Sequence, residues 1–370
     1  MKLAIVRRRH AAFGGAERFI ENVAGELVKA GHQLAIVSES WPADAGNGIE
    51  RVTVPSRGLT RASKLANFQR EVAVVVARGQ FGLVQTHERL LTADIFRAGD
   101  GVHAAWLARL EAEQGPLRNI VRRFSPMHRL IVATERRMAH ETDMVFVANS
   151  GLVARELAEW LDLQAPRIRV IENGVDMAKF HPPSASEREI ARHKFGLEGD
   201  DPVVAFVGSG FERKGAFNLV DALALPQCAS VRALIVGHDR RQAALGERIE
   251  RLGLTGRVEV LGGVNDPLAA YQAADLLALP SLYDPMPNAA LEALACGLPL
   301  LVTADTGIAD AVRENRAGAI VTRSPDDIAR GVVEILAQRD AMSSAAIALS
   351  ARFELEATTA RWLELYRELA

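Results

Sequence analysis

The sequence predicts an α/β protein with two Rossmann-like, doubly wound parallel-sheet domains facing a cleft. Short apolar runs rich in Val, Ile and Leu alternate with helix-length segments along the whole chain, which is the rhythm of βαβ units. These runs are continuous rather than alternating, as expected for strands that are covered on both faces. The chain has 370 residues, of which 49% are hydrophobic and 24% charged. At roughly 100 to 200 residues per domain, this length predicts two or three domains.

The predicted strands fall into two series. The first series covers residues 3–6, 33–37, 81–85, 144–148 and 168–171, with a helix predicted over residues 15–30. The second series covers residues 203–207, 231–236, 258–261, 276–279 and 298–302. Residues 356–369 carry Trp362, Leu365, Tyr366 and Leu369 at helical spacing, so a final amphipathic helix should dock on a domain.

The boundary between the domains is predicted near residue 173. Asn173-Gly174-Val175-Asp176 marks a turn, and Pro182-Pro183 cannot continue a helix or a central strand. We therefore expect residues 173–201 to hold the linker. The first domain then ends at residue 172, and the second begins at residue 173.

Composition limits the compartment and the chemistry. The two cysteines, Cys228 and Cys296, have no CxxC or zinc-type spacing, which favours a reducing cytoplasm and argues against thiol catalysis. The first apolar run is too short for a signal-peptide core, and no apolar run approaches the roughly 20 residues of a membrane helix. We expect a cytoplasmic protein.

Charge is unevenly distributed along the chain. Residues 1–172 hold 24 Lys and Arg against 19 Asp and Glu, whereas residues 173–370 hold 20 against 27. The stretch 116–137, with six arginines and one glutamate, accounts for the whole basic excess of the first half. Its helical spacing of apolar and basic residues predicts peripheral binding to the anionic inner face of the membrane, or else a solvated helix face. Nucleic-acid binding is less favoured, because this stretch has no series of stacking aromatic residues between its arginines and no recognised nucleic-acid fold motif. The candidate membrane contacts are Arg118, Arg122, Arg123 and Phe124.

Two glycine-containing turns follow predicted strands. Gly14 and Gly15 stand between the first strand and a helix, where a backbone can approach an anion closely, although a plain tight turn is the alternative. Residues 208–215 contain Arg213 and Lys214. They match neither GxGxxG nor Walker A. Two adjacent cations at a predicted helix start are unfavourable for the helix dipole, so they indicate a bound anion such as a diphosphate, or else a solvated Arg-Lys pair.

The most specific pattern runs from residue 280 to residue 299. Asp284 precedes a predicted helix that begins near Pro287, and Glu292 lies in that helix. Both carboxylates and the N–H groups of residues 286–289 can face one volume. Carboxylates accept paired hydrogen bonds from hydroxyl groups, as in a sugar or a ribose.

These patterns together resemble the retaining GT-B glycosyltransferases of family 4. Asp284 and Glu292 match the family's E-x7-E element, residues 208–215 match its diphosphate clamp, and residues 173–176 match its interdomain NGVD. Within the family, the chain resembles in particular the enzymes that add glucose to the inner-core heptose of lipopolysaccharide. Gly14-Gly15, Ser40-Trp41, Ala98-x-Asp100 and Asn265-Asp266 carry that likeness. The resemblance also implies that the C-terminal helix returns to the N-terminal, acceptor-binding domain. The domains would then be residues 1–172 with 356–370, and residues 173–355, which bind the nucleotide sugar.

The resemblance implies a role for each residue. Gly15 would approach the donor β-phosphate, with Gly14 beside it, while Arg213 and Lys214 would neutralise the leaving diphosphate. Glu292 would hold the ribose hydroxyls. The transferred sugar would bind Asp284 and the segment after it, which comprises Met286, Pro287, Asn288 and Ala289. The clamp implies that no metal is needed, and the sequence has no DxD motif. The co-substrate would be a nucleotide sugar, with UDP-glucose as the leading choice.

Some alternatives stay open. The family usually has Glu where this chain has Asp284, which is one methylene shorter, so another sugar could be selected. The polar group on the acceptor side is Asp100 or His103, and each could instead be a structural cap or turn residue. Retention suggests front-face substitution, because no carboxylate is placed as a nucleophile. A nucleotide-sugar epimerase on the same fold and a two-lobed sugar-binding protein are the other functions considered.

Overall fold

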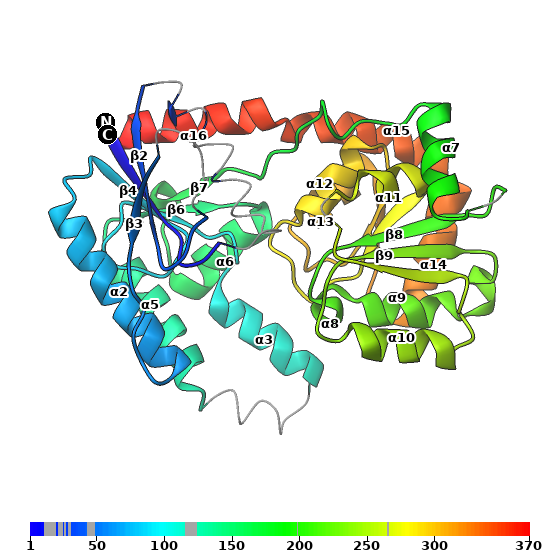
Figure 1. Cartoon of the computed structure of the whole chain (residues 1–370), viewed down its shortest axis with the longest axis horizontal. Helices are drawn as coiled ribbons and strands as arrows, with labels where there is room; N and C mark the ends of the chain where they lie inside the picture. The colour runs from blue at the N-terminus through cyan, green and yellow to red at the C-terminus, as the bar shows by residue number, and fades with distance from the viewer. Residues whose placement is uncertain are drawn as a thin grey trace. The chain divides into compact units, whose positions relative to one another are not determined.

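The computed structural model describes residues 1–10, 20, 25, 27–28, 31–42, 49–114, 124–197, 199–264 and 266–370. The chain forms two compact units (Figure 1). Unit 1 contains Met1–Asn173 and Glu356–Ala370, and unit 2 contains Gly174–Leu355. The division lies one residue beyond the boundary drawn from the sequence.

Unit 1 is built on a parallel sheet. Within the described residues this sheet has seven strands in the order β3-β2-β1-β4-β5-β6-β7, so the chain winds outward from β1 in both directions. The strands are β1 (Lys2–Val6), β2 (Gln33–Ser38), β3 (Ile49–Thr53), β4 (Leu83–Thr86), β5 (Ile95–Arg97), β6 (Val145–Ala148) and β7 (Ile168–Val170). The α-helices with assigned bounds are α2 (Arg61–Arg78), α3 (His103–Gln114), α5 (Pro126–Glu141), α6 (Gly151–Leu161) and α16 (Leu355–Leu369), and a 3-10 turn covers Ala165–Arg167.

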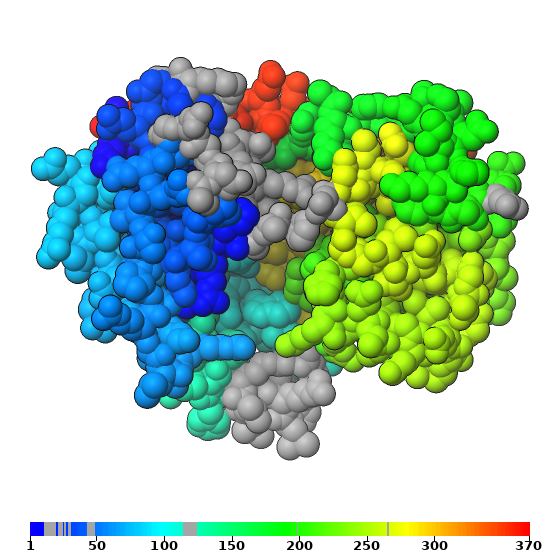
Figure 2. Space-filling model, in the orientation of Figure 1, coloured from blue at the N-terminus to red at the C-terminus, as the bar shows by residue number. Residues whose placement is uncertain are grey.

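The C-terminal helix α16 returns to unit 1, as predicted. Trp362, Leu365 and Tyr366 are buried in one apolar cluster with Leu3 and Ile5 of β1. The hydroxyl of Tyr366 donates to Gln85 Oε1 at 2.6 Å. Both ends of the chain therefore lie at one edge of unit 1 (Figures 1 and 2).

Unit 2 repeats the doubly wound pattern. In its described residues, a six-stranded parallel sheet has the order β10-β9-β8-β11-β12-β13. The strands are β8 (Val203–Val207), β9 (Arg232–Val236), β10 (Val258–Gly262), β11 (Leu276–Leu279), β12 (Leu300–Val302) and β13 (Gly318–Ile320). The helices are α7 (Ala185–Lys194), α8 (Phe211–Lys214), α9 (Ala216–Leu223), α10 (Gln242–Arg251), α11 (Leu268–Ala273), α12 (Asn288–Ala295), α13 (Ala309–Asn315), α14 (Pro325–Ala337) and α15 (Arg339–Ser350), with 3-10 turns at Pro226–Cys228 and Ala351–Phe353.

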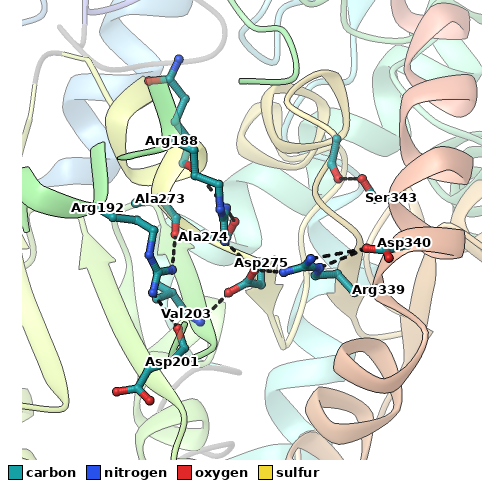
Figure 3. Close-up of polar contacts among 12 residues, drawn as sticks. Arg188, Arg192, Asp201, Val203, Ala273, Ala274, Asp275, Arg339, Asp340 and Ser343 are labelled. Atoms are coloured by element: carbon teal, nitrogen blue, oxygen red, sulfur yellow. Dashed lines mark hydrogen bonds and ion pairs between the residues drawn. The ribbon is translucent and has the colours of Figure 1, made fainter. Parts of the chain in front are cut away.

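A buried carboxylate fastens two helices to the amino-terminal edge of this sheet. Asp275 Oδ1 accepts from Arg188 of α7 at 2.7 Å and from Arg339 of α15 at 2.8 Å, while Oδ2 accepts from the N–H of Val203 at 2.8 Å. Figure 3 shows the two guanidinium groups reaching Asp275 from two sides. Every charged group in the contact has a partner, so α7 and α15 are tied to this end of the sheet, opposite to the carboxyl ends of the strands.

Two parts of the fold differ from the sequence prediction. Strands β3, β5 and β13 were not predicted, because two of them have only three residues and β3 is polar and largely exposed. Much of the predicted linker is also folded: residues 185–194 form α7, which begins with a capping box between Ser184 and Glu187. The helix predicted over residues 15–30 lies mostly outside the described residues.

Candidate active site

The candidate site of unit 2 lies at the carboxyl ends of β8 and β11. Residues 208–215 follow β8, and residues 280–292 lead from β11 into α12. The backbone joins the two segments, because the N–H of Leu282 donates to the carbonyl of Arg213 at 2.7 Å. Adjacent strands of a parallel sheet thus bring together the two most specific sequence patterns, at the edge where such sheets bind ligands.

Arg213 and Lys214 form the centre of this site with Asp284. Lys214 Nζ lies 2.7 Å from Asp284 Oδ2, and Arg213 Nη1 lies 3.5 Å from the same oxygen. Arg213 also donates to the carbonyl of Tyr283 at 2.7 Å. Asp284 is only 7% exposed. Two cations are therefore held next to one buried acid, and this trio carries a net positive charge.

Two glycines make room for the cations. A Cβ on Gly208 would lie 2.8 Å from Cδ of Lys214, so the lysine side chain runs directly over this residue. Gly215 has φ +85°, and a Cβ there would lie 2.3 Å from the carbonyl oxygen of Pro280. These close approaches explain why glycine is needed on both sides of Arg213 and Lys214.

The cations keep Asp284 ionised. Burial by itself would raise the pKa of the Asp284 carboxyl, but Lys214 and then Arg213 outweigh it, and the pKa is lowered. The acid therefore carries its charge at neutral pH. It can accept hydrogen bonds from the hydroxyl groups of a ligand, and it orients Lys214.

The start of α8 differs from the sequence prediction. Arg213 and Lys214 are the last two residues of this short helix rather than the first residues of a long one. The N–H groups of Gly210 and Phe211 donate to Asp239 Oδ2 at 2.9 and 3.1 Å. A carboxylate from the loop after β9 therefore caps the turn, so the two side-chain cations, rather than these N–H groups, are the natural contacts for an anion.

The segment after Asp284 starts α12. The N–H of Asp284 donates to the carbonyl of Asp305 at 3.1 Å, and its carbonyl accepts from Gly307 at 2.8 Å, so this loop is tied to the one after β12. The side chains of Met286 and Pro287 are buried, while Asn288 and Ala289 are partly exposed. Pro287 has no N–H to offer a ligand, which corrects the prediction of an unbroken row of donors.

Glu292 lies on α12 and is 5% exposed. Its Oε2 accepts a hydrogen bond of 2.8 Å from the hydroxyl of Tyr271 on α11. One turn later, burial and then Glu292 raise the pKa of the Cys296 thiol to about 12. Cys296 therefore remains a neutral thiol, consistent with the prediction against thiol chemistry.

A second polar cluster lies in unit 1, in the segments that follow β4 and β5. Arg89 Nε and Glu135 Oε1 form a buried ion pair at 3.0 Å, and Glu135 accepts from the N–H of His103 at 3.1 Å with each oxygen. His103 Nε2 lies 2.9 Å from His128 Nδ1. Burial, then Arg89 and His128, lower the pKa of His103 to about 4, so its ring is neutral at physiological pH. Asp100 is 67% exposed at its side chain and lies 3.7 Å from Arg89.

Several predicted site residues fall outside the described residues. They are Gly14, Gly15, Asn265, Arg118, Arg122 and Arg123. Phe124 lies two residues before the start of α5 and is 71% exposed. In the described part of the chain, no helix combines the length and apolar character needed to cross a bilayer.

Sequence reasoning missed the partners of the predicted residues. Tyr271, Asp239, Glu135 and His128 contact them from elements far away in the sequence. Each belongs to an ordinary helix or loop pattern, and only the fold brings it to the site.

Two Rossmann-like units, with the candidate site at the carboxyl edge of the second sheet, make up the GT-B fold. The family described as "Glycosyl transferases group 1" matches residues 187–349, and the one described as "Glycosyltransferase Family 4" matches residues 13–179. The chain belongs to glycosyltransferase family 4, as its motifs suggested.

Three relatives illustrate the range of the similarity. The D-inositol 3-phosphate glycosyltransferase of Salinispora tropica is 30% identical over 96% of this chain and 81% of its own length. The lipopolysaccharide glucosyltransferase WaaG of Escherichia coli is 26% identical over 87% of this chain and 85% of its own length. A crystal structure of WaaG matches 98% of this chain and 99% of its own with a TM-score of 0.86 and 23% identity. HepE of Anabaena, solved with UDP-glucose, matches 100% of both chains with a TM-score of 0.75 and 20% identity.

Proposed function

We propose that this glycosyltransferase moves glucose from UDP-glucose onto a heptose of the lipopolysaccharide core, or onto a similar membrane-borne glycan, with retention of anomeric configuration. The observation that carries the proposal is the contact of Lys214 and Arg213 with Asp284, at 2.7 and 3.5 Å. It joins a site for an anionic leaving group to an acid that can bind sugar hydroxyls. The likeness to WaaG supports the choice of sugar and acceptor.

The two cations would stabilise the departing diphosphate. Negative charge develops on the leaving phosphate as the bond to the sugar breaks, and fixed positive charges lower the energy of that state. Lys214 and Arg213 are held before the ligand arrives, so little reorganisation is needed. Because these residues can neutralise the diphosphate, we propose that the reaction needs no divalent metal.

The acids and the segment after Asp284 would bind the rest of the donor. Glu292 is proposed to hold the ribose hydroxyls, and Asp284 with residues 286–289 the transferred sugar. Gly14 and Gly15 are proposed to approach the donor phosphate. Of the two acceptor-side candidates we favour Asp100, because its carboxylate is largely exposed whereas Nε2 of His103 contacts His128.

Retention is proposed to proceed by front-face substitution. In this mechanism the leaving phosphate oxygen takes the proton of the acceptor hydroxyl while that hydroxyl attacks the same face of the sugar. Asp284 is paired with two cations, which disfavours it as a covalent nucleophile. Proton NMR of the product would show a retained α-linkage, and an inverted linkage would exclude the mechanism.

A second acceptor class has support from the comparisons. Several D-inositol 3-phosphate glycosyltransferases match most of this chain, and two of them at 30% identity. Because sequence identity alone does not choose between the acceptors, both should be assayed with one donor. Transfer to heptose-terminated core oligosaccharide but not to inositol 3-phosphate is the expected result, and the opposite result would replace the lipopolysaccharide assignment.

The donor is testable by thermal shift. A ligand that binds only the folded protein raises its melting temperature, so UDP-, GDP- and ADP-sugars should be compared. We expect the largest shift with UDP-glucose. Incubation of that donor without acceptor distinguishes a transferase, which hydrolyses it slowly, from an epimerase, which would convert the sugar.

We also propose peripheral binding to the inner face of the cytoplasmic membrane through residues 116–137. Phe124 is exposed at one end of α5, and Arg129 and Arg136 are exposed on that helix. The protein should sediment with anionic liposomes in a salt-sensitive manner. Replacement of Arg118, Arg122 and Arg123 by Ser should abolish this, and unchanged sedimentation would reject the membrane contact.

A further inference from the structure

We propose that Tyr271 is a positioning residue that fixes the carboxylate of Glu292 for recognition of a nucleotide's ribose hydroxyls. This inference rests on the proposed function, in which unit 2 binds a nucleotide sugar. It concerns a residue outside all the sequence motifs, which reaches Glu292 of α12 from α11.

The contact is short and shielded from water. The Tyr271 hydroxyl donates to Glu292 Oε2 at 2.8 Å, and both side chains are buried. A charged acceptor strengthens such a hydrogen bond, and a buried carboxylate is costly to leave without donors. The bond therefore constrains the torsion that sets the plane of the Glu292 carboxylate.

Tyr271 is itself held in place. Its ring packs edge to face against Phe180, with 6.0 Å between the ring centroids, and α11 packs against α7. The tyrosine is fully buried in the main apolar cluster of unit 2. Because the ring cannot swing away, the hydroxyl is a fixed point from which the carboxylate takes its orientation.

Orientation matters because of what a ribose presents. Two neighbouring hydroxyl groups can both donate to one carboxylate only when its plane faces them, and the acceptor directions of each oxygen are limited. A site built to bond a hydroxyl group discriminates against a ligand that lacks it, because its own polar group is then left unpaired. Tyr271 should therefore affect selectivity for the ribose, which a purely structural tyrosine would not.

The test compares the binding of ribonucleotides and deoxynucleotides by calorimetry. UDP, GDP and ADP are titrated into the whole protein, and the nucleotide that binds is compared with its 2′-deoxy and 3′-deoxy forms. In the wild type, loss of at least one hydroxyl should weaken binding tenfold or more. The ratio of interest is the affinity for the ribonucleotide divided by the affinity for its deoxy form. In Tyr271→Phe this ratio should fall at least threefold, and the ribonucleotide itself should bind about tenfold more weakly. With donor sugar, KM should rise more than kcat falls.

Tyr366→Phe is the matched control. This variant also removes a buried hydroxyl that donates to a side-chain oxygen, Gln85 Oε1 at 2.6 Å, but it lies in unit 1. It should lose stability like Tyr271→Phe and keep the wild-type ratio. Suppose that the affinity ratio of ribonucleotide to deoxynucleotide is tenfold in the wild type. If the ratio in Tyr271→Phe lies within twofold of that value, the inference is overturned and the proposed function is left intact. Failure of the wild type to bind any of the three nucleotides would overturn both.

A measurement on the wild-type chain covers the case in which Tyr271→Phe does not fold. The sequence contains three tyrosines, so fluorotyrosine labelling gives three fluorine signals, which Tyr366→Phe and Tyr283→Phe assign. Each nucleotide is added to saturation. The fluorine signal of Tyr271 should then shift more with the ribonucleotide than with the deoxynucleotide that binds more weakly. Equal shifts would refute the coupling between Tyr271 and the ribose.

Discussion

Replacement of Lys214 by Met should damage both the stability of unit 2 and catalysis. The ammonium group lies 2.7 Å from Asp284 Oδ2, and the exposed fractions of the two side chains are 11% and 9%. The value of about 0 to 1 kcal/mol that applies to exposed ion pairs is therefore too small here. Removing one partner of a buried pair costs about 3 to 5 kcal/mol. Because Arg213 remains 3.5 Å from the acid, we expect the lower end, about 3 kcal/mol.

The loss of stability and of activity should be visible in four measurements. Urea unfolding should give the lower free energy of unfolding, and the melting temperature should fall by roughly 6 to 12 °C for a domain of this size. The pKa of Asp284 is lowered in the folded wild type, so its ionised form contributes stability above the unfolded pKa, near 4, and loses it as pH falls through the folded pKa. Without Lys214 burial should raise that pKa, and acid unfolding should begin at a higher pH. Under conditions where the variant is folded, kcat/KM should fall at least tenfold, or about 1.4 kcal/mol.

Lys179→Met provides the control within the same unit. Lys179 pairs with Asp266 at 3.3 Å, but the two side chains are 42% and 53% exposed. We expect less than about 1 kcal/mol of destabilisation and activity within twofold of the wild type. If Lys214→Met unfolds within 1 kcal/mol of Lys179→Met and transfers sugar at the wild-type rate, the buried clamp has no role in either property.

Three further outcomes are expected. Asp275→Ala should lower the free energy of unfolding in urea by about 3 to 5 kcal/mol, because it leaves Arg188 and Arg339 without their shared acid. Asp340→Ala, at a side chain that is 93% exposed, should lower it by less than about 1 kcal/mol. Equal losses in the two variants would contradict the anchoring role of Asp275. The pKa of His103 is lowered to about 4, so unfolding takes up a proton between the unfolded pKa near 6.5 and pH 4, and stability should decrease as pH falls through that window. His103→Gln should flatten this slope, and a persistent slope would assign it to other groups. EDTA should leave sugar transfer within twofold of its original rate, and a loss restored by Mn²⁺ would show a metal requirement.

The parallel-sheet architecture was predictable because buried strands have a strong signal in the sequence. Residues 203–207 and 276–279 were predicted with the observed bounds. Continuous runs of β-branched residues and leucine are typical of strands that are buried on both faces of a parallel sheet. Strands β5 and β13 are three residues long and lie outside every predicted run, whereas the equally short β7 and β12 lie within the predicted runs 168–171 and 298–302. A strand without such a run is recognised only from its pairing with neighbouring strands, which a local pattern does not show.

Motifs in contiguous sequence were also accessible. Arg213-Lys214 and the acids Asp284 and Glu292 were identified because their spacing is fixed by one loop or one helix turn. The distance between the two segments was not accessible. The parallel pairing of β8 with β11 brings Lys214 and Asp284 to 2.7 Å across 70 positions of the chain.

The sequence alone therefore determined the class of fold, the family and the kinds of side chain at the candidate site of unit 2. Tertiary structure alone decided which polar groups contact each other. Lys214 forms an ion pair with Asp284, Asp239 accepts hydrogen bonds at the start of α8, and Tyr271 donates a hydrogen bond to Glu292. The physical reason is that local patterns reflect burial and backbone conformation along one segment. Hydrogen bonds and ion pairs between segments depend on strand order and helix packing, which only the folded chain specifies.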